Sequence, residues 1–243
     1  MTLRLPQFVL DRPAIGEGVA VFPLFRQQAA FESDYVLGSE LLDTETLAIV
    51  AVDVEEEGVV VRCQQVRNCG EKPILLVAGD DLGKPWVFDV SFIVGPHSFV
   101  NCPILCVADH SPFPSHDSLS HRKGAAGLVV AYADRVFVNV LDSVQTCEKL
   151  WPHCLGMLMG HCVNTPTWQL GASLDIDLDR VRWEAVQGIG LGQHWIARRR
   201  GFRGDALSLN GKVVHVSLSA DWSILHNKPH RKRHGRHFRF PDE

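Results

Sequence analysis

Short apolar runs rich in β-branched and aromatic residues recur along this chain, and clusters of Gly, Pro, Asp and Asn separate them. Runs of this kind are typical of strands joined by turns. The pattern predicts strands at Val19–Phe25, Leu47–Val54, Gly58–Val66, Ile74–Ala78, Trp86–Val94, Ser98–Val107, Gly127–Ala131, Arg135–Leu141, His194–Arg200, Asp205–Leu209 and Lys212–Ser219. The second and third strands, the seventh and eighth, and the last two are expected to form hairpins. Asn210-Gly211 joins the last pair and is the strongest of these turn signals.

Helical spacing is strongest in Ser143–Val163, where apolar residues recur on one face at Leu150, Cys154, Leu155, Leu158, Met159 and Cys162. Pro152 is expected to kink this helix or to begin a second one. A shorter helix is predicted over Glu32–Asp43, with Ser33 as its N-cap. Many strands with one main helix predict an α+β fold of predominantly antiparallel β-sheet. We expect a sandwich or a curled sheet with the main helix packed on one face.

The chain has 243 residues, a length that fits one large domain or two small ones and allows a sizeable core. We expect an N-terminal leader over residues 1–15, where Pro6 and Pro13 disfavour helix. A single domain is predicted over residues 16–222. The remaining residues, 223–243, are rich in His and Arg and are predicted to form a flexible basic tail.

Charge is spread unevenly along the chain. The segment His226–Glu243 carries six Lys/Arg and two acidic residues, a net charge of +4, so the −4 of the whole chain leaves −8 for the rest. A mildly acidic body argues against nucleic-acid binding over the whole surface and leaves only weak contact through the tail. Apolar runs such as Gly124–Ala133 fall short of the roughly 20 residues of a membrane helix, so no membrane partner is expected. Seven cysteines without a CxxC pair favour reduced thiols and a cytoplasmic location.

The turn between the fourth and fifth predicted strands is the most informative for function. It reads Gly79-Asp80-Asp81-Leu82-Gly83-Lys84, and its glycines allow backbone to approach a ligand closely. Lys84 could hold a phosphate while Asp80 or Asp81 accepts a hydrogen bond from a ribose hydroxyl, a division of roles suited to a nucleotide diphosphate. The alternative is a solvated hairpin turn, because Gly and Asp are common turn residues.

Cys106 and His215 are the candidate catalytic pair. A thiolate nucleophile needs an imidazole base within hydrogen-bonding distance, and both residues lie in predicted strands. In such strands an inward-facing Cys or His is also a common core residue or ligand-wall residue.

Two groups of residues contain potential metal ligands. In the first, four residues of strand separate Cys102 from Cys106 by roughly 13 Å, too far for two sulfur ligands of one zinc ion; His97 and His110 flank this pair. The second is a loop with Asp109, His110, His116, Asp117 and His121. Flexible His-rich loops seldom hold a specific metal, so no metal site is predicted. Gly188-Ile-Gly-Leu-Gly192 is expected to be a hairpin turn and not a dinucleotide fingerprint, because no βαβ unit surrounds it, and no cofactor is expected.

Several stretches resemble one known family. They are VAVFPLF at Val19–Phe25, KPILLVAGDDLGK at Lys72–Lys84, CPILCV at Cys102–Val107, GLVVAYADRVFVNVLDSVQTCEKLWPHCL at Gly127–Leu155 and the closing GLGQHWIARRRGFRGDALSLNGKVVHVSLSA. Together they are similar to the ARG-and-rhodanese-phosphatase-superfamily-associated protein domain family, first type, over about residues 16–222. The chain resembles a divergent member. Where the family pattern continues with Gln-Asn-Arg after the central lysine, this chain has Pro85-Trp86-Val87, and Ala108 stands where Glu follows the Cys-Val strand.

The resemblance implies a cytosolic ligand-binding domain connected with ADP-ribose or NAD-derived nucleotide metabolism. Loss of polar residues from the family pattern implies weak or absent catalysis. One alternative is a hydrolase or transferase that uses Lys84 for phosphate and Cys106 or His215 for chemistry. The other is a structural or partner-binding domain that makes contact through the basic tail; the oligomeric state is not predicted.

Overall fold

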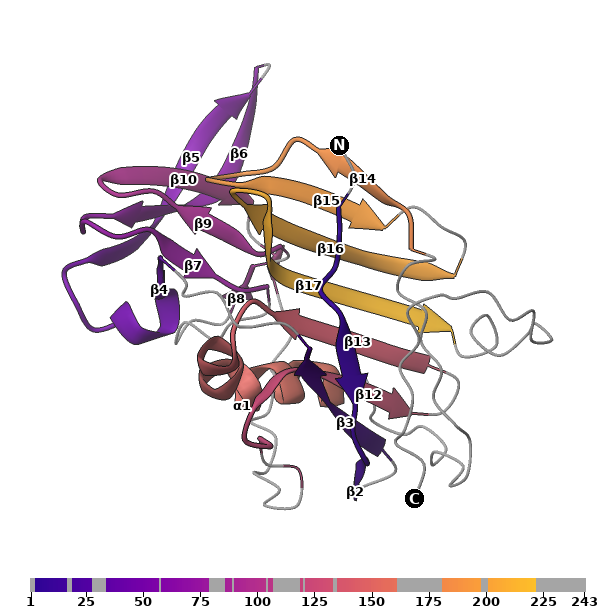
Figure 1. Cartoon of the computed structure of the whole chain (residues 1–243). Helices are drawn as coiled ribbons and strands as arrows, with labels where there is room; N and C mark the ends of the chain where they lie inside the picture. Colours follow the sequence, from indigo (N-terminus) through magenta and orange to yellow (C-terminus); the bar gives the residue numbers. More distant parts are fainter. Residues whose placement is uncertain are drawn as a thin grey trace.

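The structure is a computed structural model, and it describes residues 3–16, 19–27, 34–56, 58–78, 86–88, 90–103, 105–106, 119, 121–132, 135–160, 181–197 and 201–221. Most of these residues lie in antiparallel sheets, and the described part contains one α-helix, which confirms the predicted α+β, β-rich class (Figure 1). No helix in these ranges combines the length and the apolar character of a membrane-spanning segment.

A nine-stranded antiparallel sheet forms the body of the molecule. Its order is β1-β3-β12-β13-β17-β16-β15-β14, and β2 also pairs with β3. The strands are β1 (Phe8–Leu10), β2 (Ala14–Gly16), β3 (Val19–Arg26), β12 (Ala125–Tyr132), β13 (Arg135–Leu141), β14 (Trp183–Val186), β15 (Gln193–Ala197), β16 (Phe202–Leu209) and β17 (Lys212–Asp221). Three predicted hairpins are confirmed here: β12–β13, β16–β17 and the β14–β15 pair across the Gly188–Gly192 turn.

Both faces of this large sheet are buried, which explains why β12 is apolar at nearly every position. The helix α1 (Val144–Gly160) covers one face, packing Leu150, Trp151 and two cysteines against β12 and β13. Apolar residues on the opposite face of the sheet form a second core cluster. The predicted helix is therefore confirmed, and it continues through Pro152 as one element without starting a second helix at this residue.

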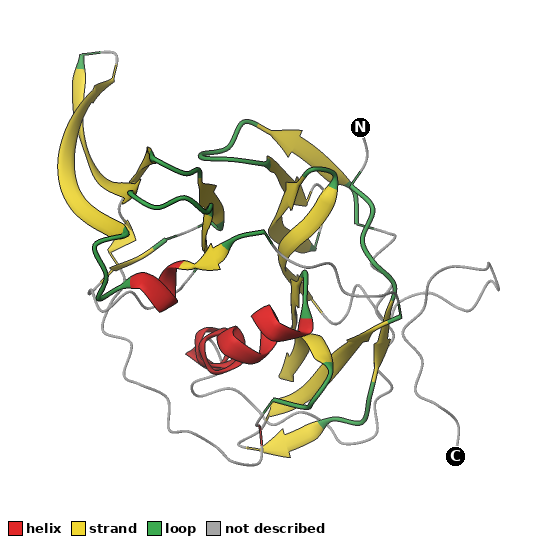
Figure 2. Cartoon of the chain, turned by 60° about the vertical axis from the view of Figure 1, so that its left-hand side comes forward, coloured by secondary structure: helices red, strands yellow, loops and turns green. Residues whose placement is uncertain are grey.

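Smaller sheets flank the body (Figures 1 and 2). One has the order β10-β6-β5, and another has the order β4-β7-β9, with the short pair β11-β8 beside them. Their strands are β4 (Val36–Leu37), β5 (Leu47–Glu56), β6 (Val59–Asn68), β7 (Ile74–Leu76), β8 (Trp86–Val87), β9 (Phe92–Val94), β10 (Ser98–Pro103) and β11 (Leu105–Cys106). The predicted β5–β6 hairpin is confirmed. Residues of β4, β7 and β9 join the α1 side of the core, so the β4-β7-β9 sheet and the helix cover the same face of the large sheet.

Three element predictions are corrected, and the first is the single strand Ser98–Val107, which forms β10 paired with β6 and β11 paired with β8. The segment predicted as a helix over Glu32–Asp43 forms β4 and a short 3-10 helix, Gly38–Leu41, because Val36-Leu37 pairs in parallel with Ile74-Leu75. Tertiary pairing thus overrides helical spacing in a segment too short to be a stable helix alone. Predicted strand Trp86–Val94 is two strands, since β8 pairs with β11 and β9 pairs with β7.

The N-terminal residues belong to the fold. β1 pairs with β3 through Phe8↔Arg26 to Leu10↔Leu24, and Leu3 and Leu5 are part of the core cluster on the face opposite α1. The sheet therefore begins before residue 16, where the domain was predicted to start. The predicted tail, residues 223–243, lies outside the described residues.

Candidate functional site

His215 lies in the centre of β17 and is fully buried on the α1 side of the large sheet. Its register partners are Leu141 in β13 and Leu207 in β16. The register with β16 shifts directly after Leu207, which leaves Val214 as an extra residue. A bulge of this kind re-aims the side chains next to it. The bulge at Val214 therefore lies directly beside His215, the one titratable residue in the middle of β17.

Both ring nitrogens of His215 have hydrogen-bond partners. Nδ1 lies 2.8 Å from Ser91 Oγ, and Nε2 lies 3.0 Å from Asn139 Oδ1. The backbone N–H of Ala78 donates to the same Ser91 Oγ at 2.8 Å. An amide oxygen only accepts, so Nε2–H donates to Asn139 and Nδ1 accepts the hydroxyl hydrogen of Ser91. We call these three side chains the Ser91–His215–Asn139 network.

All three side chains of the network are inaccessible to solvent: Ser91 is 1% exposed, Asn139 and His215 0%. Burial lowers the pKa of His215 to about 3, and His153 on α1 adds to the shift. The imidazole is therefore neutral at pH 7, in agreement with its two hydrogen bonds to neutral groups. A base with so low a pKa has little capacity to take a proton from a thiol near neutral pH.

The network joins elements from different sheets. Asn139 comes from β13 and His215 from β17, both in the large sheet, whereas Ser91 directly precedes β9 in a small sheet. The amide nitrogen Nδ2 of Asn139 is also buried and has no hydrogen-bond partner within the described ranges. Sequence reasoning missed Ser91 and Asn139. The available signal was that each is a lone polar residue inside an apolar run, VSFIV and VFVNVL.

The network also contacts the base of the predicted ligand loop. Asp80, Asp81 and Lys84 lie outside the described residues, but the residues on either side of the loop are described. On one side Ala78 donates to Ser91, and on the other side Trp86 pairs with Cys106 between β8 and β11. The structure thus brings His215 close to the first end of the loop and the backbone of Cys106 close to the second. The Cys106 side chain is outside the described part, so the Cys106–His215 pair stays a prediction.

The residues considered above as potential metal ligands lie in different places where the structure describes them. His97 Nε2 lies 3.1 Å from Glu71 Oε1 at the surface, and Cys102 is buried in β10 opposite Gln64. Among the described residues there is no group of three or more His, Cys, Asp or Glu side chains suited to a metal ion.

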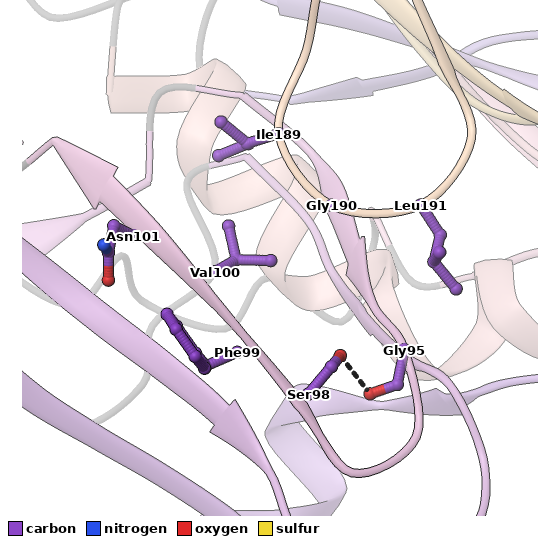
Figure 3. Close-up of a pocket in the computed structure, with 8 residues that line it drawn as sticks. All are labelled: Gly95, Ser98, Phe99, Val100, Asn101, Ile189, Gly190 and Leu191. Atoms are coloured by element: carbon purple, nitrogen blue, oxygen red, sulfur yellow. Dashed lines mark hydrogen bonds between the residues drawn. The ribbon is translucent and has the colours of Figure 1, made fainter.

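A shallow groove of about 320 Å³ lies away from the network, between β10 and the β14–β15 turn (Figure 3). Ser98 to Asn101 form one wall, and Ile189, Gly190 and Leu191 form the other. The turn is held against β9 by a hydrogen bond from Leu191 N–H to the Ile93 carbonyl at 2.7 Å. The described residues that line the groove include the polar Ser98 and Asn101 but no Lys or Arg, so they offer no positive charge for a phosphate.

No family model, curated protein or solved structure matches this chain.

Proposed function

We propose that this chain is a ligand-binding domain for ADP-ribose or a related nucleotide, with weak or no catalytic activity. In this proposal the loop of residues 79–85 contacts the ligand. Lys84 binds a phosphate, and Asp80 or Asp81 accepts a hydrogen bond from a ribose hydroxyl.

One observation carries the proposal: the hydrogen bond from Ala78 N–H to Ser91 Oγ, which is itself bonded to the buried His215. Ala78 lies two residues before Asp80, so a rigid buried network holds the loop at its first end. Function is commonly carried by loops placed on a rigid scaffold. Fixing one end of a loop also reduces the conformational entropy lost when the loop binds a ligand.

The state of His215 favours binding over catalysis. The imidazole is fully buried, is occupied by two neutral partners and has a pKa of about 3. A general base acting near pH 7 requires a higher pKa and access to the substrate. We therefore assign His215 the role of a positioning residue for the loop.

Calorimetric titration of the full chain with ADP-ribose, NAD and AMP tests this proposal. Lys84→Ala removes a charged hydrogen-bond donor and should weaken binding of the phosphate-containing ligands by roughly 10- to 100-fold, the equivalent of about 1.5–3 kcal/mol. Lys72→Ala is the matched control, because Lys72 is an exposed lysine just before β7 and should leave binding unchanged.

Three results would contradict the proposal. If none of the ligands binds, or if both lysine variants behave like the original chain, the loop is not a phosphate site. If a bound ligand is turned over and Cys106→Ala abolishes turnover without affecting affinity, the hydrolase or transferase alternative is correct. Binding detected by calorimetry should also raise the melting temperature, since a ligand at 100 times its Kd adds about 2.7 kcal/mol of stability.

A further inference from the structure

The groove between β10 and the β14–β15 turn follows the edge of a strand (Figure 3). Four consecutive residues of β10, Ser98 to Asn101, line it. Successive side chains of a strand point to opposite faces of the sheet. A groove that touches four residues in a row therefore runs along the edge of β10 and not over one face. β10 is the last strand of its sheet, and no described strand pairs with this edge.

The pairing of β10 with β6 determines which backbone groups point into the groove. The register continues without a shift to its last pair, Pro103↔Cys63. Pro103 has no N–H, so this pair cannot exchange two hydrogen bonds. Hydrogen-bonded and non-hydrogen-bonded pairs alternate along an antiparallel ladder. Phe99 and Asn101 are therefore also in non-hydrogen-bonded pairs, and their N–H and C=O groups point away from β6.

The other side of β6 requires the same alternation. Cys69 N–H donates to the Thr46 carbonyl at 2.8 Å, which is the bond that flanks a non-hydrogen-bonded pair between Leu47 and Asn68. Asn68 must then direct its own backbone groups toward β10, and the next pair along β10 directs them away. The outward groups at the groove have no hydrogen-bond partner within the described part of the chain.

The side chains at the groove are apolar or neutral. Phe99 is 57% exposed and Leu191 on the opposite wall is 41% exposed. Between them, Val100 and Ile189 pack against the core cluster of the small sheets. A strand that lies along β10 would place the side chain opposite Val100 against these two residues. That side chain must be uncharged, because the described lining offers no counter-charge.

The face of the β10-β6-β5 sheet that carries Phe99 has a different character. Phe99 and Asn101 pair there with Arg67 and Gln65 of β6, so Arg67 is the one charged residue in these two pairs. Arg67 is exposed, and its Nη2 donates to Gln65 Oε1 at 3.1 Å. It has no carboxylate partner among the described residues. A strand added to β10 would lie two strand spacings from Arg67, about 10 Å, which long acidic and basic side chains can span.

We propose that this groove binds an extended peptide segment of a partner protein, which adds to β10 as an antiparallel strand. The other pairs of this sheet are also antiparallel. The peptide alternates acidic and aliphatic residues, as in Glu-Val-Glu. Its valine lies against Val100 and Ile189, and its glutamates lie opposite Phe99 and Asn101 on the face of Arg67. Main-chain hydrogen bonds supply affinity, and the alternating side chains supply specificity.

NMR titration of the isotope-labelled full chain with the blocked pentapeptide Thr-Glu-Val-Glu-Thr tests this proposal. The amide resonances of Phe99 and Asn101 should shift, because their N–H groups donate new hydrogen bonds to the peptide. The amides of Ser98 and Val100 point toward β6 and should shift less.

Modified peptides separate strand addition from other modes of binding. N-methylation of the second glutamate removes an N–H that points at β10 and should abolish the shifts. N-methylation of the last threonine, whose N–H points away from β10, should leave them unchanged. Thr-Lys-Val-Lys-Thr should bind several-fold more weakly than the acidic peptide, and Arg67→Glu should reverse this order.

Asn101→Pro and Asn101→Ala form a matched pair of variants. Both lose the side chain that accepts a hydrogen bond from Gln65 Nε2 at 3.1 Å, but only proline also removes the outward N–H. Proline is compatible with the sheet at this position for the same reason as at Pro103. The proline variant should bind the acidic peptide roughly 2- to 12-fold more weakly than the alanine variant, the equivalent of one hydrogen bond. Unchanged resonances of the large sheet would show that both variants fold.

The proposal is overturned if millimolar peptide leaves the Phe99 and Asn101 amides unshifted. It is also overturned if both N-methylated peptides bind like the original peptide, or if the proline and alanine variants bind equally well. Slow exchange of the Phe99 and Asn101 amides in the free chain would show that the protein itself or a second copy already covers this edge, and would exclude a partner peptide. No nucleotide takes part, so these results are independent of the nucleotide-binding proposal.

Discussion

At the scale of single residues, His215 is distinguished by complete burial in a neutral form. Its hydrogen bonds to Ser91 and Asn139 satisfy both ring nitrogens. Burial disfavours the charged form, which is why its pKa is lowered to about 3. In the unfolded chain the same imidazole has a pKa near 6.5, so the unfolded state binds the proton more readily.

This difference in pKa predicts a pH dependence of stability. The contribution of neutral His215 is fully present above pH 6.5 and is lost as the pH falls toward 3. At pH 5 the loss relative to pH 7 should amount to about 2 kcal/mol of unfolding free energy, since each pH unit corresponds to about 1.4 kcal/mol. Urea unfolding at pH 7 and pH 5 measures it.

His215→Gln provides the comparison, because glutamine is of similar size and does not titrate. The variant should be less stable than the original chain at pH 7, but its stability should fall less between pH 7 and pH 5. An equal fall in both proteins would show that other groups cause the pH dependence.

At the scale of elements, the β14–β15 turn is connected to β9 through a close backbone approach. Gly190 has a φ of +73°, and a Cβ at this position would lie 2.2 Å from the Ile93 carbonyl oxygen. The neighbouring Leu191 N–H donates to that same oxygen. Only glycine combines this backbone conformation with this proximity.

Gly190→Ala should therefore destabilise the protein much more than Gly58→Ala. Gly58, in the turn of the β5–β6 hairpin, also has positive φ, +80°, but an added Cβ would meet no atom within 4 Å. The Gly58 variant isolates the conformational cost, about 1–2 kcal/mol. The Gly190 variant adds displacement of the Ile93 backbone, and the difference between the two in denaturant unfolding measures this clash. Equal destabilisation would mean that the turn moves away from β9 at little cost.

At the scale of the whole molecule, the large sheet and the small β4-β7-β9 sheet meet in one core. Leu75, Val77 and Ile93 pack into the same cluster as residues of β12, β17 and α1. The apolar contacts hold the two sheets together. The hydrogen bonds of the Ser91–His215–Asn139 network depend on direction, so they also favour one orientation of the sheets relative to each other. A network with fixed geometry specifies one arrangement of the sheets, because an unpaired buried polar group is costly.

Ser91→Ala tests this role. The substitution leaves the Ala78 N–H and His215 Nδ1 without their buried partner, so the unfolding free energy should fall by about 1–3 kcal/mol. Ser98→Ala is the control. Ser98 Oγ donates to the Gly95 carbonyl at 2.7 Å but is only partly buried, so water can replace the bond and the loss should be smaller. Equal losses in the two variants would show that the buried hydrogen bonds of Ser91 stabilise the protein no more than the partly exposed hydrogen bond of Ser98.

The hairpins and the main helix were predictable because their signals are local. Asn210 and Gly211 both have positive φ, as the Asn-Gly hairpin turn requires. The pairing of Val36-Leu37 with β7 was not predictable, since it depends on residues far away in the chain. For the same reason the leader was expected outside the sheet, although Phe8–Leu10 pairs with β3.

The candidate site was likewise predictable only in part. His215 was predicted as a site residue because an imidazole could serve as base for Cys106, but its partners Ser91 and Asn139 lie 124 and 76 residues away in the chain. By itself the sequence determined strand pattern, turn chemistry and the asymmetry of charge, all of which depend on residues close in the chain. Tertiary structure alone decided which polar residues meet in the core. The reason is physical: burial and hydrogen bonding of a side chain depend on what the fold packs around it.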